Sequence, residues 1–315
     1  MMKLIAPLAL LLLAACDGNL IGAGDGSGGG GGDGGGGGGG GGGVPTEPVV
    51  PAAVAVNLKA ITYSAAGGGT LLVTLDGLDA TDSTAAFVRT PGLDTNGYQA
   101  FVYQETGLQR SHLALVKTNA NGNLIATAVS DGGQFGFHFG GNSFARLDTF
   151  TRPTVGLFSY TGSYAGVFVP GGSATPALPP TFQPTLPYRV EGDILINASF
   201  ADNRVNGGIT NRVIVNDSGA VLLPLESLNL APATIDADGR FLGEVQLSGD
   251  PPGEDPTEAT GAGSYAGLFG GLGATDIAGA LVINPIRNES LIWEYGAWNL
   301  PRCGTAGEGP LCALQ

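Results

Sequence analysis

From about residue 52 onward, apolar and polar residues alternate over short runs that end in glycine-containing turns. Residues 70–75 lead into Asp-Gly at 76–77, and residues 123–129 lead into Asp-Gly at 131–132. A period of two places apolar side chains on one face of a strand, and Asp-Gly pairs favour tight turns. The pattern predicts an antiparallel β-meander in this part of the chain. Only residues 83–89 have a weak helical tendency.

The alternation is clearer in the second half of the chain. Residues 193–200 place four apolar side chains on one face, and residues 205–215 return as a partner strand. Residues 240–247 alternate in the same way. Two Pro-rich stretches, 170–187 and 250–256, are typical of long loops between strands.

One seven-residue motif occurs twice. Residues 162–168 read Gly-Ser-Tyr-Ala-Gly-Val-Phe, and residues 263–269 read Gly-Ser-Tyr-Ala-Gly-Leu-Phe. Glycines inside strands mark bends or close backbone approach, as the corners of a barrel require. Two tandem small domains would explain the repeat, but residues 290–315 are too few to complete a second one. We therefore expect one closed sheet with equivalent strands near its beginning and its end.

These motifs resemble the β-barrel domain of transferrin-binding protein B lipoproteins. Residues 161–168 and the hairpin at 193–212 carry part of the resemblance. The strongest match is residues 267–280, which are similar to the closing signature F-x-G-x-x-A-x-E-x-x-G of that barrel. Asp276 stands where the family usually has Glu, and we expect it to accept backbone hydrogen bonds at a tight turn, which is a structural role. The resemblance covers residues 155–295.

The resemblance implies an all-β fold: a small β-rich handle domain, residues 52–150, followed by an eight-stranded antiparallel β-barrel, residues 151–300. It also implies a non-enzymatic binding protein whose ligand is an extracellular protein or a nutrient such as a metal or haem carrier. An outer-membrane lipoprotein translocator or a TonB-dependent receptor is the implied partner. The classical transferrin binder has two lobes and this chain has room for one, which argues against transferrin itself.

The N-terminus has the pattern of a lipoprotein signal peptide. Lys3 supplies a positive charge, residues 4–13 are apolar, and Leu13-Ala14-Ala15-Cys16 reads as a lipobox. The apolar run is too short to span a bilayer, which needs about 20 residues. We predict cleavage after residue 15 and lipidation of Cys16; an ordinary secretory signal with a chance cysteine is the alternative.

Glycine dominates residues 17–51, with prolines at the far end of the segment. Such a composition buries too little apolar surface to offset its ordering entropy, so we expect a disordered tether with a reach of roughly 30 Å. The chain would then be lipid-anchored in the outer membrane and displayed at the cell surface. Asp17 leaves inner-membrane retention open, because Asp after the lipidated cysteine has that effect in enteric bacteria.

Charge and cysteine content narrow the function classes. The formal net charge is −14 and no basic run occurs, which argues against nucleic-acid binding. Cys303 and Cys312 are close together near the C-terminus, and in an oxidising compartment we expect them to form a disulfide loop within residues 301–315. Two ligands of a metal site is the alternative, but no histidine or further cysteine lies nearby.

The chain has no constellation of catalytic residues. His112 follows Ser111 directly, so on a strand the two side chains point apart. His138 lacks a second ligand, and we interpret it as a strand histidine rather than a haem or metal ligand. Residues 236–239 resemble the start of a calcium loop but lack its later ligands, so a turn is favoured. Residues 250–258 form an acidic Pro-rich loop that we interpret as solvated.

The sequence therefore predicts a non-enzymatic, surface-exposed lipoprotein without a cofactor or a metal, whose ligand-binding residues cannot be named. A periplasm-facing structural or inhibitory barrel is the alternative. No sequence motif supports a third function, a hydrolase that uses Asp and Glu residues.

Overall fold

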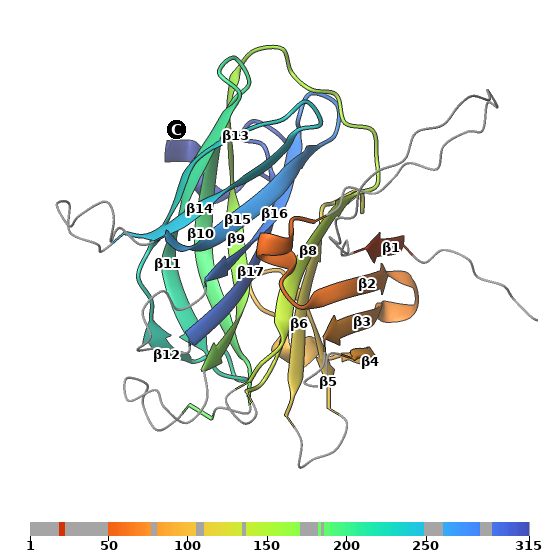
Figure 1. Cartoon of the computed structure of the whole chain (residues 1–315). Coiled ribbons are helices and arrows are strands. Elements are labelled where there is room, and N and C mark those ends of the chain that lie inside the picture. The colour runs from red at the N-terminus through yellow and green to blue at the C-terminus, as the bar shows by residue number, and fades with distance from the viewer. Residues whose placement is uncertain are drawn as a thin grey trace, which may run out of the picture.

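The computed structural model contains two antiparallel β-sheets that pack against each other (Figure 1). It describes residues 19–22, 50–76, 81–104, 110–133, 137–170, 182–183, 186–248, 261–283 and 292–314. The predicted all-β fold class is confirmed, because the longest helical element among these residues is the 3-10 turn η3, Pro310–Leu314. None of the described helices has the length and apolar character that a membrane span requires.

The first sheet, which we call the handle, is a meander in which each strand pairs with its sequence neighbours. Its strands are β1 (Asn19–Gly22), β2 (Leu58–Ser64), β3 (Thr70–Asp76), β4 (Asp82–Arg89), β5 (Gln99–Tyr103), β6 (His112–Thr118), β7 (Leu124–Asp131) and β8 (Gly140–Arg146). Short helical turns precede or interrupt it at α1 (Ala52–Ala55), η1 (Ala66–Gly68) and η2 (Pro91–Leu93). The predicted antiparallel meander is confirmed.

Two parts of the handle differ from the sequence-based expectation. Residues 83–89, given a weak helical tendency, belong to β4, because pairing with β3 gives alternate backbone groups hydrogen-bond partners and the strand buries Phe87. Residues 19–22, inside the expected tether, form β1 on the edge of β2. This short segment contains the adjacent apolar residues Leu20 and Ile21, whereas glycine dominates residues 23–43. An open sheet edge pairs readily with such an apolar segment.

The second sheet closes into the predicted eight-stranded antiparallel barrel. Its strands are β9 (Leu157–Pro170), β10 (Tyr188–Ser199), β11 (Arg204–Val215), β13 (Leu228–Thr234), β14 (Arg240–Leu247), β15 (Gly261–Gly270), β16 (Asp276–Ile283) and β17 (Ile292–Pro301). The order is β10-β9-β17-β16-β15-β14-β13-β11, and the β10–β11 pairing closes the ring. The short strand β12 (Val221–Pro224) pairs with the end of β11.

The repeated motif lies in two strands of this one barrel. The first copy is in β9 and the second in β15, so the expected single closed sheet is confirmed. In both copies the tyrosine, Tyr164 or Tyr265, faces the barrel core, and the alanine next in sequence faces the handle. The repeat therefore encodes a strand with one aromatic face inside the barrel and one flat face for packing.

Apolar contacts fill the space between the two sheets. Small side chains on the outer surface of the barrel, among them Ala266, Ala280 and Ala297, pack against Leu115 and Phe144 of the handle. Buried amides cross the same interface: Asn142 Nδ2 donates to the carbonyl oxygen of Leu281 at 2.8 Å. The opposite face of the handle encloses a core of its own, because the sheet curls so that β2–β4 cover β5–β8. The handle and the barrel thus share one interface that combines apolar packing with buried hydrogen bonds.

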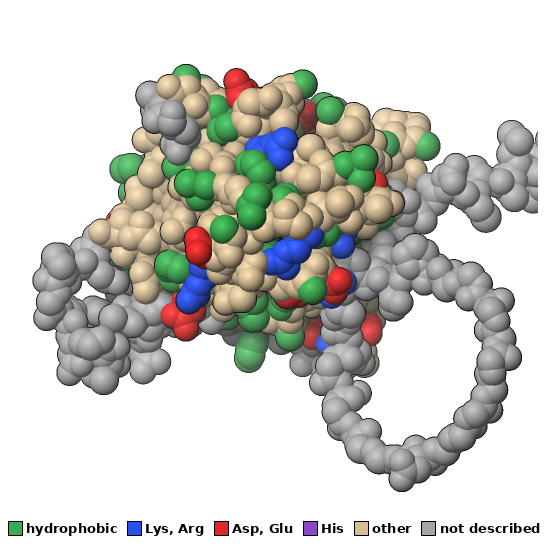
Figure 2. All heavy atoms as spheres, turned by 90° about the horizontal axis from the view of Figure 1, so that it is seen from above, with side chains coloured by type: hydrophobic (Ala, Val, Ile, Leu, Met, Phe, Trp, Pro, Cys, Tyr) green, Lys and Arg blue, Asp and Glu red, His purple; other side chains and the backbone are tan. Residues whose placement is uncertain are grey.

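Arginine side chains cover aromatic rings at the end of the barrel that carries the β10–β11, β13–β14 and β15–β16 turns. Figure 2 views the molecule from this end and shows cationic and apolar side chains interspersed. The guanidinium carbon of Arg146 lies 4.7 Å from the ring centroid of Phe150. The corresponding distances are 6.0 Å from Arg152 to Phe200 and 4.6 Å from Arg302 to Phe158. Such cation–π pairs seal the aromatic core at this end.

Candidate functional site

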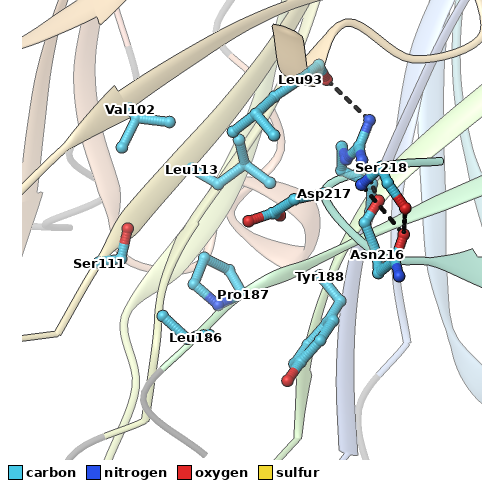
Figure 3. Close-up of a pocket in the computed structure, with 11 residues that line it drawn as sticks. Leu93, Val102, Ser111, Leu113, Leu186, Pro187, Tyr188, Asn216, Asp217 and Ser218 are labelled. Carbon is cyan, nitrogen blue, oxygen red and sulfur yellow. Dashed lines mark hydrogen bonds between the residues drawn. The ribbon is translucent and has the colours of Figure 1, made fainter. Parts of the chain in front are cut away.

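A cleft of about 480 Å³ lies at the junction of the handle and the barrel, near the end opposite the one seen in Figure 2. Figure 3 shows its lining. The handle contributes Leu93, Val102, Ser111 and Leu113; the barrel contributes residues 186–189 at the start of β10 and residues 216–218 in the β11–β12 turn. Its volume falls within the range of ligand pockets, and such pockets often form between two structural units.

The handle wall of the cleft is apolar because of strand register. Val102 of β5 lies opposite Leu113 of β6, and it also lies opposite Val88 of β4. Directly paired residues point to the same face of a sheet. Leu113 is buried, Val102 is half-buried and Val88 is exposed, so an apolar stripe runs from inside the cleft to the surface.

Arg189 joins the two units at the base of the cleft. Its guanidinium donates to the carbonyl oxygen of Leu93 in the handle at 3.0 Å and to the carbonyl oxygen of Asn216 in the barrel. Burial lowers the pKa of Arg189, while the nearby carboxylates of Asp217, Glu191 and Asp94 act in the opposite direction. Arginine keeps its charge in such surroundings, so the residue acts as a cationic bridge between the two walls.

The β11–β12 turn presents a carboxylate to the cleft. The side-chain oxygen of Asn216 accepts hydrogen bonds from the backbone N–H of Ser218 at 3.0 Å and of Ala220 at 2.9 Å. This Asx turn, completed by Gly219 at φ +79°, orders the loop. Figure 3 shows the Asp217 carboxylate directed into the cleft, and Asp217 is exposed. The cleft thus has apolar walls, the Arg189 cation at its base and an exposed carboxylate from the turn.

An aromatic side chain forms part of the barrel wall. Tyr188 packs its ring edge to face with Phe182, with centroids 4.9 Å apart. Its hydroxyl accepts a hydrogen bond from the backbone N–H of Gln183 at 2.7 Å. Tyrosine with an apolar ring and a polar end is a common binding residue.

A second set of polar contacts joins the handle to the barrel. Asn96 Nδ2 donates to the carbonyl oxygens of Tyr164 and Gly192, both at 2.9 Å, and the Tyr98 hydroxyl donates to that of Ala297 at 2.9 Å. Lys117 Nζ donates to Ser163 Oγ at 2.8 Å. Burial lowers the pKa of Lys117 to about 8. These contacts fix the position of the handle relative to the barrel.

The predicted disulfide is confirmed. Cys303 and Cys312 are joined, with their Cα atoms 5.4 Å apart. Glu308 lies near both sulfurs, but sulfurs in a disulfide are not thiolate ligands. The predicted lipidation site, Cys16, lies outside the described residues, as does Asp17.

Asp276 lies at the predicted turn, but the hydrogen bond that its carboxylate accepts there comes from a side chain rather than from the backbone. It begins β16 after the tight turn at the end of β15, and its Oδ2 accepts a hydrogen bond from the hydroxyl of Thr275 at 2.7 Å. That turn is held by the backbone: Gly273 N–H donates to the carbonyl oxygen of Thr151 at 3.0 Å.

The histidines do not form a site together. The ring of His112 packs against those of Phe87 and Tyr103, whereas Ser111 lines the cleft, so the two neighbours do point apart. His138 packs against Trp293 at 5.0 Å. Burial lowers the pKa of each histidine to about 4, so both are neutral at physiological pH.

The structure tests only one of the two acidic segments, residues 236–239 and 250–258. Asp236 Oδ1 accepts hydrogen bonds from the backbone N–H of Asp238 at 2.9 Å and of Arg240 at 2.8 Å, which confirms a turn at residues 236–239. The segment 250–258 lies outside the described residues.

Sequence reasoning missed the cleft residues. An Asn-Asp-Ser-Gly run at 216–219 between two apolar segments is a recognisable hairpin signal, yet nothing local relates it to Leu93 or Val102. The other omission is an ion pair inside the barrel between Arg212 and Glu294, which are 82 residues apart.

No protein-family model and no curated protein sequence matches this chain. Among solved structures, it is similar to transferrin-binding protein B of Haemophilus parasuis Hp5, a double mutant, with 11% identity over 78% of this chain and 53% of that one and a TM-score of 0.37. It is also similar to isotype 1 transferrin-binding protein B from serogroup B Neisseria meningitidis, with 13% identity, 78% and 52% coverage and a TM-score of 0.34. A structure described as a surface lipoprotein has 17% identity, 59% and 79% coverage and a TM-score of 0.36.

The chain spans about half the length of the two transferrin-binding proteins. These are proteins of the family that residues 155–295 resemble in sequence. The fold and the cleft follow from the strand pairings and contacts of this chain.

Proposed function

We propose that this chain is a lipid-anchored surface protein that binds an extracellular protein or nutrient carrier, without catalysis, through the cleft between handle and barrel. The observation that carries the proposal is the cleft itself, with apolar walls from two units, a buried arginine at its base and a carboxylate directed into it. Ligand pockets combine apolar walls with a few fixed polar groups in this way.

The walls favour a partner that inserts an apolar side chain next to a positive charge. Val102, Leu113 and Tyr188 offer the apolar contact. Asp217 offers an exposed carboxylate, and the whole chain carries a formal charge of −14. A basic surface on the partner would therefore be attracted over a distance and would then be oriented at the cleft.

The lipobox at residues 13–16 supports anchoring through Cys16, and an outer-membrane translocator is the proposed export partner. Protease shaving of intact cells tests the exposed location: surface display predicts cleavage of the folded domain without lysis. Protection in intact cells and cleavage after lysis would favour the alternative, a periplasm-facing barrel, which Asp17 motivates.

Binding is tested by comparing cleft variants of the mature chain in pull-down from the growth environment of the source organism. Val102→Arg places a cation on the half-buried apolar wall, and Leu242→Arg places one on an exposed position of β14. We expect the partner captured by the wild type to be retained by Leu242→Arg and lost by Val102→Arg.

Equal capture by both variants would show that the partner binds elsewhere, and the cleft would lose its proposed role. Unfolding curves of each variant establish that a loss of capture is not a loss of fold.

A further inference from the structure

Among the residues that the structure describes, part of one backbone edge of strand β4, next to the cleft, has no strand partner. Strand β4 pairs with β3 from Asp82 to Phe87. Its pairing with β5 is confined to Val88 and Arg89 within the described residues. The strand β5 ends at Tyr103. Residues 82–84 and Ala86 are exposed.

Backbone directions along β4 are fixed by its neighbours. Thr90 N–H donates to the carbonyl oxygen of Ala100 across the β4–β5 pair at 2.9 Å. Successive backbone groups in a strand point to opposite sides, so every second residue before Thr90 also points toward β5. Val88 uses this direction to pair with β5. The N–H and C=O groups of Asp82, Thr84 and Ala86 therefore point to the open edge.

A second hydrogen bond gives the same assignment. Asp76 N–H donates to the carbonyl oxygen of Asn57, toward β2, at 3.0 Å. Leu75, Val73 and Leu71 must then point toward β4, where they lie opposite Ser83, Ala85 and Phe87. Ser83, Ala85 and Phe87 are consequently bonded to β3, and the outward backbone groups of Asp82, Thr84 and Ala86 have no strand partner among the described residues.

We propose that this edge, together with the cleft, binds an extended segment of a partner protein by β-strand addition. The proposal rests on the proposed binding function and gives it a partner class. Main-chain groups in a row select an extended polypeptide, because a compact ligand cannot satisfy alternate donors and acceptors along a strand. Exposed, partly apolar edges attract such segments.

The surroundings of the edge define the side chains of that segment. On the outer face Ala86 and Thr84 lie next to Val88, which is 68% exposed and opposite the cleft residue Val102. An added strand would thus place alternate side chains along an apolar path that leads into the cleft. At the far end, the exposed Asp82 favours a lysine or arginine. The expected segment is extended, apolar at alternate positions and basic at one end.

Charge disfavours a second copy of this chain as the occupant. Two copies would bring together molecules with a formal charge of −14 each, and net charge of one sign opposes self-association. A basic partner, in contrast, is attracted by the negative net charge of this chain.

Amide hydrogen exchange on the full mature chain tests the proposal with a synthetic peptide, acetyl-Lys-Val-Thr-Val-Thr-Val-amide. We expect the peptide to slow exchange at Thr84 and Ala86 by about tenfold or more, and to leave Ala85 and Phe87, already bonded to β3, unchanged. A matched peptide that is N-methylated at alternate residues cannot donate to the edge, and it should have no effect.

Proline variants remove the edge donors one at a time. Ala86→Pro and Thr84→Pro delete an N–H that points away from β3, a position where an edge strand tolerates proline. Each should weaken peptide binding by about tenfold, the loss expected for one or two hydrogen bonds. Ala86→Ser and Thr84→Ser keep the N–H and should bind as the wild type does.

Three results would overturn the proposal. The first is slow exchange at Thr84 and Ala86 in the free chain, which would show that the edge is already covered. The second is protection that grows with protein concentration, which would show that a second copy covers it. The third is unchanged exchange at saturating peptide. Because this experiment uses no natural partner, its failure leaves the pull-down result with Val102→Arg standing, and the two proposals fail separately.

Discussion

The Arg212 guanidinium and the Glu294 carboxylate form an ion pair inside the barrel, where their side chains are 4% and 3% exposed. The second carboxylate oxygen of Glu294 accepts a hydrogen bond from the Tyr164 hydroxyl at 2.5 Å. Burial and the neighbouring Glu294 raise the pKa of Tyr164 well above its usual value, so the hydroxyl remains a donor. Three strands, β9, β11 and β17, are linked through one carboxylate.

Removal of one partner from this pair should be strongly destabilising. Arg212→Met leaves the Glu294 charge buried without its cation, and we expect a loss of about 3–5 kcal/mol in the free energy of unfolding. Urea unfolding measures it. The double variant Arg212→Met with Glu294→Leu should lose less than Arg212→Met alone, because no charge is left unpaired. A single-variant loss below about 1 kcal/mol would contradict the prediction.

Gly296 makes room for the same tyrosine. A Cβ atom at this position would lie 1.9 Å from the Tyr164 hydroxyl oxygen. Gly296→Ala should push the ring away from Glu294 and cost about 1–3 kcal/mol or more. Gly208 is the matched control on β11, since its nearest contact would be an ordinary 3.4 Å to the carbonyl oxygen of Leu228. Thermal or urea unfolding should separate the two alanine variants; equal losses would show that the clash is relieved elsewhere.

Much of the fold could be predicted from local pattern. Alternation fixes the face of each strand, which is why the side chains of Ile194 and Ile196 are both in the barrel core. The repeated motif predicted two equivalent strands, and the cysteine spacing predicted the disulfide. The strand at 19–22 was missed because it is formed by an available edge on β2 and only weakly by its own sequence.

The cleft could not be predicted, for a different physical reason. Leu93 and Asn216 meet only through Arg189, and no periodicity along the chain records a contact between residues more than 100 positions apart. The Arg212–Glu294 pair is similar: each residue interrupts an apolar alternation, which indicates a buried charge but does not identify its partner. Sequence patterns indicate the buried face of each strand and the positions of turns, whereas the cleft depends on how the handle packs against the barrel.

Reduction of the C-terminal disulfide should lower stability moderately. The bond between Cys303 and Cys312 closes a short loop, for which the chain-entropy model gives roughly 2–3 kcal/mol. The loop is attached to the barrel, since Cys303 N–H donates to the carbonyl oxygen of Ser159 at 2.8 Å. The Cys303→Ser and Cys312→Ser double variant should therefore unfold at lower urea concentration than the wild type. Dithiothreitol should reproduce the shift in the wild type and leave the variant unchanged; a shift in the variant would indicate an effect of the reagent alone.

Asp131 should make the stability of the chain fall as pH rises from about 4 to 7. Its side chain is 1% exposed and lies 2.8 Å from Arg110 Nη1. Burial nevertheless outweighs this cation and raises the pKa of Asp131 to about 7. An unfolded Asp titrates near pH 3.9. Between the two values the folded chain holds the proton and the unfolded chain does not, so each increase in pH favours unfolding.

His112 and His138 act in the opposite direction over nearly the same range. Burial lowers the pKa of each to about 4, and the unfolded chain therefore binds more protons up to about pH 6.5. Their contribution makes stability rise with pH, and the wild-type slope is the sum of the two effects.

Asp131→Asn removes only the contribution of Asp131, which makes the free energy of unfolding fall as pH rises. In urea unfolding between pH 4 and 7, we expect the variant to have a more positive slope of unfolding free energy against pH than the wild type. His138→Phe, which keeps a ring against Trp293, should have a less positive slope. The slope is the decisive quantity, because loss of the ion pair also changes the absolute stability of Asp131→Asn. Parallel profiles for all three proteins would show that these groups titrate in the folded chain as they do in the unfolded one.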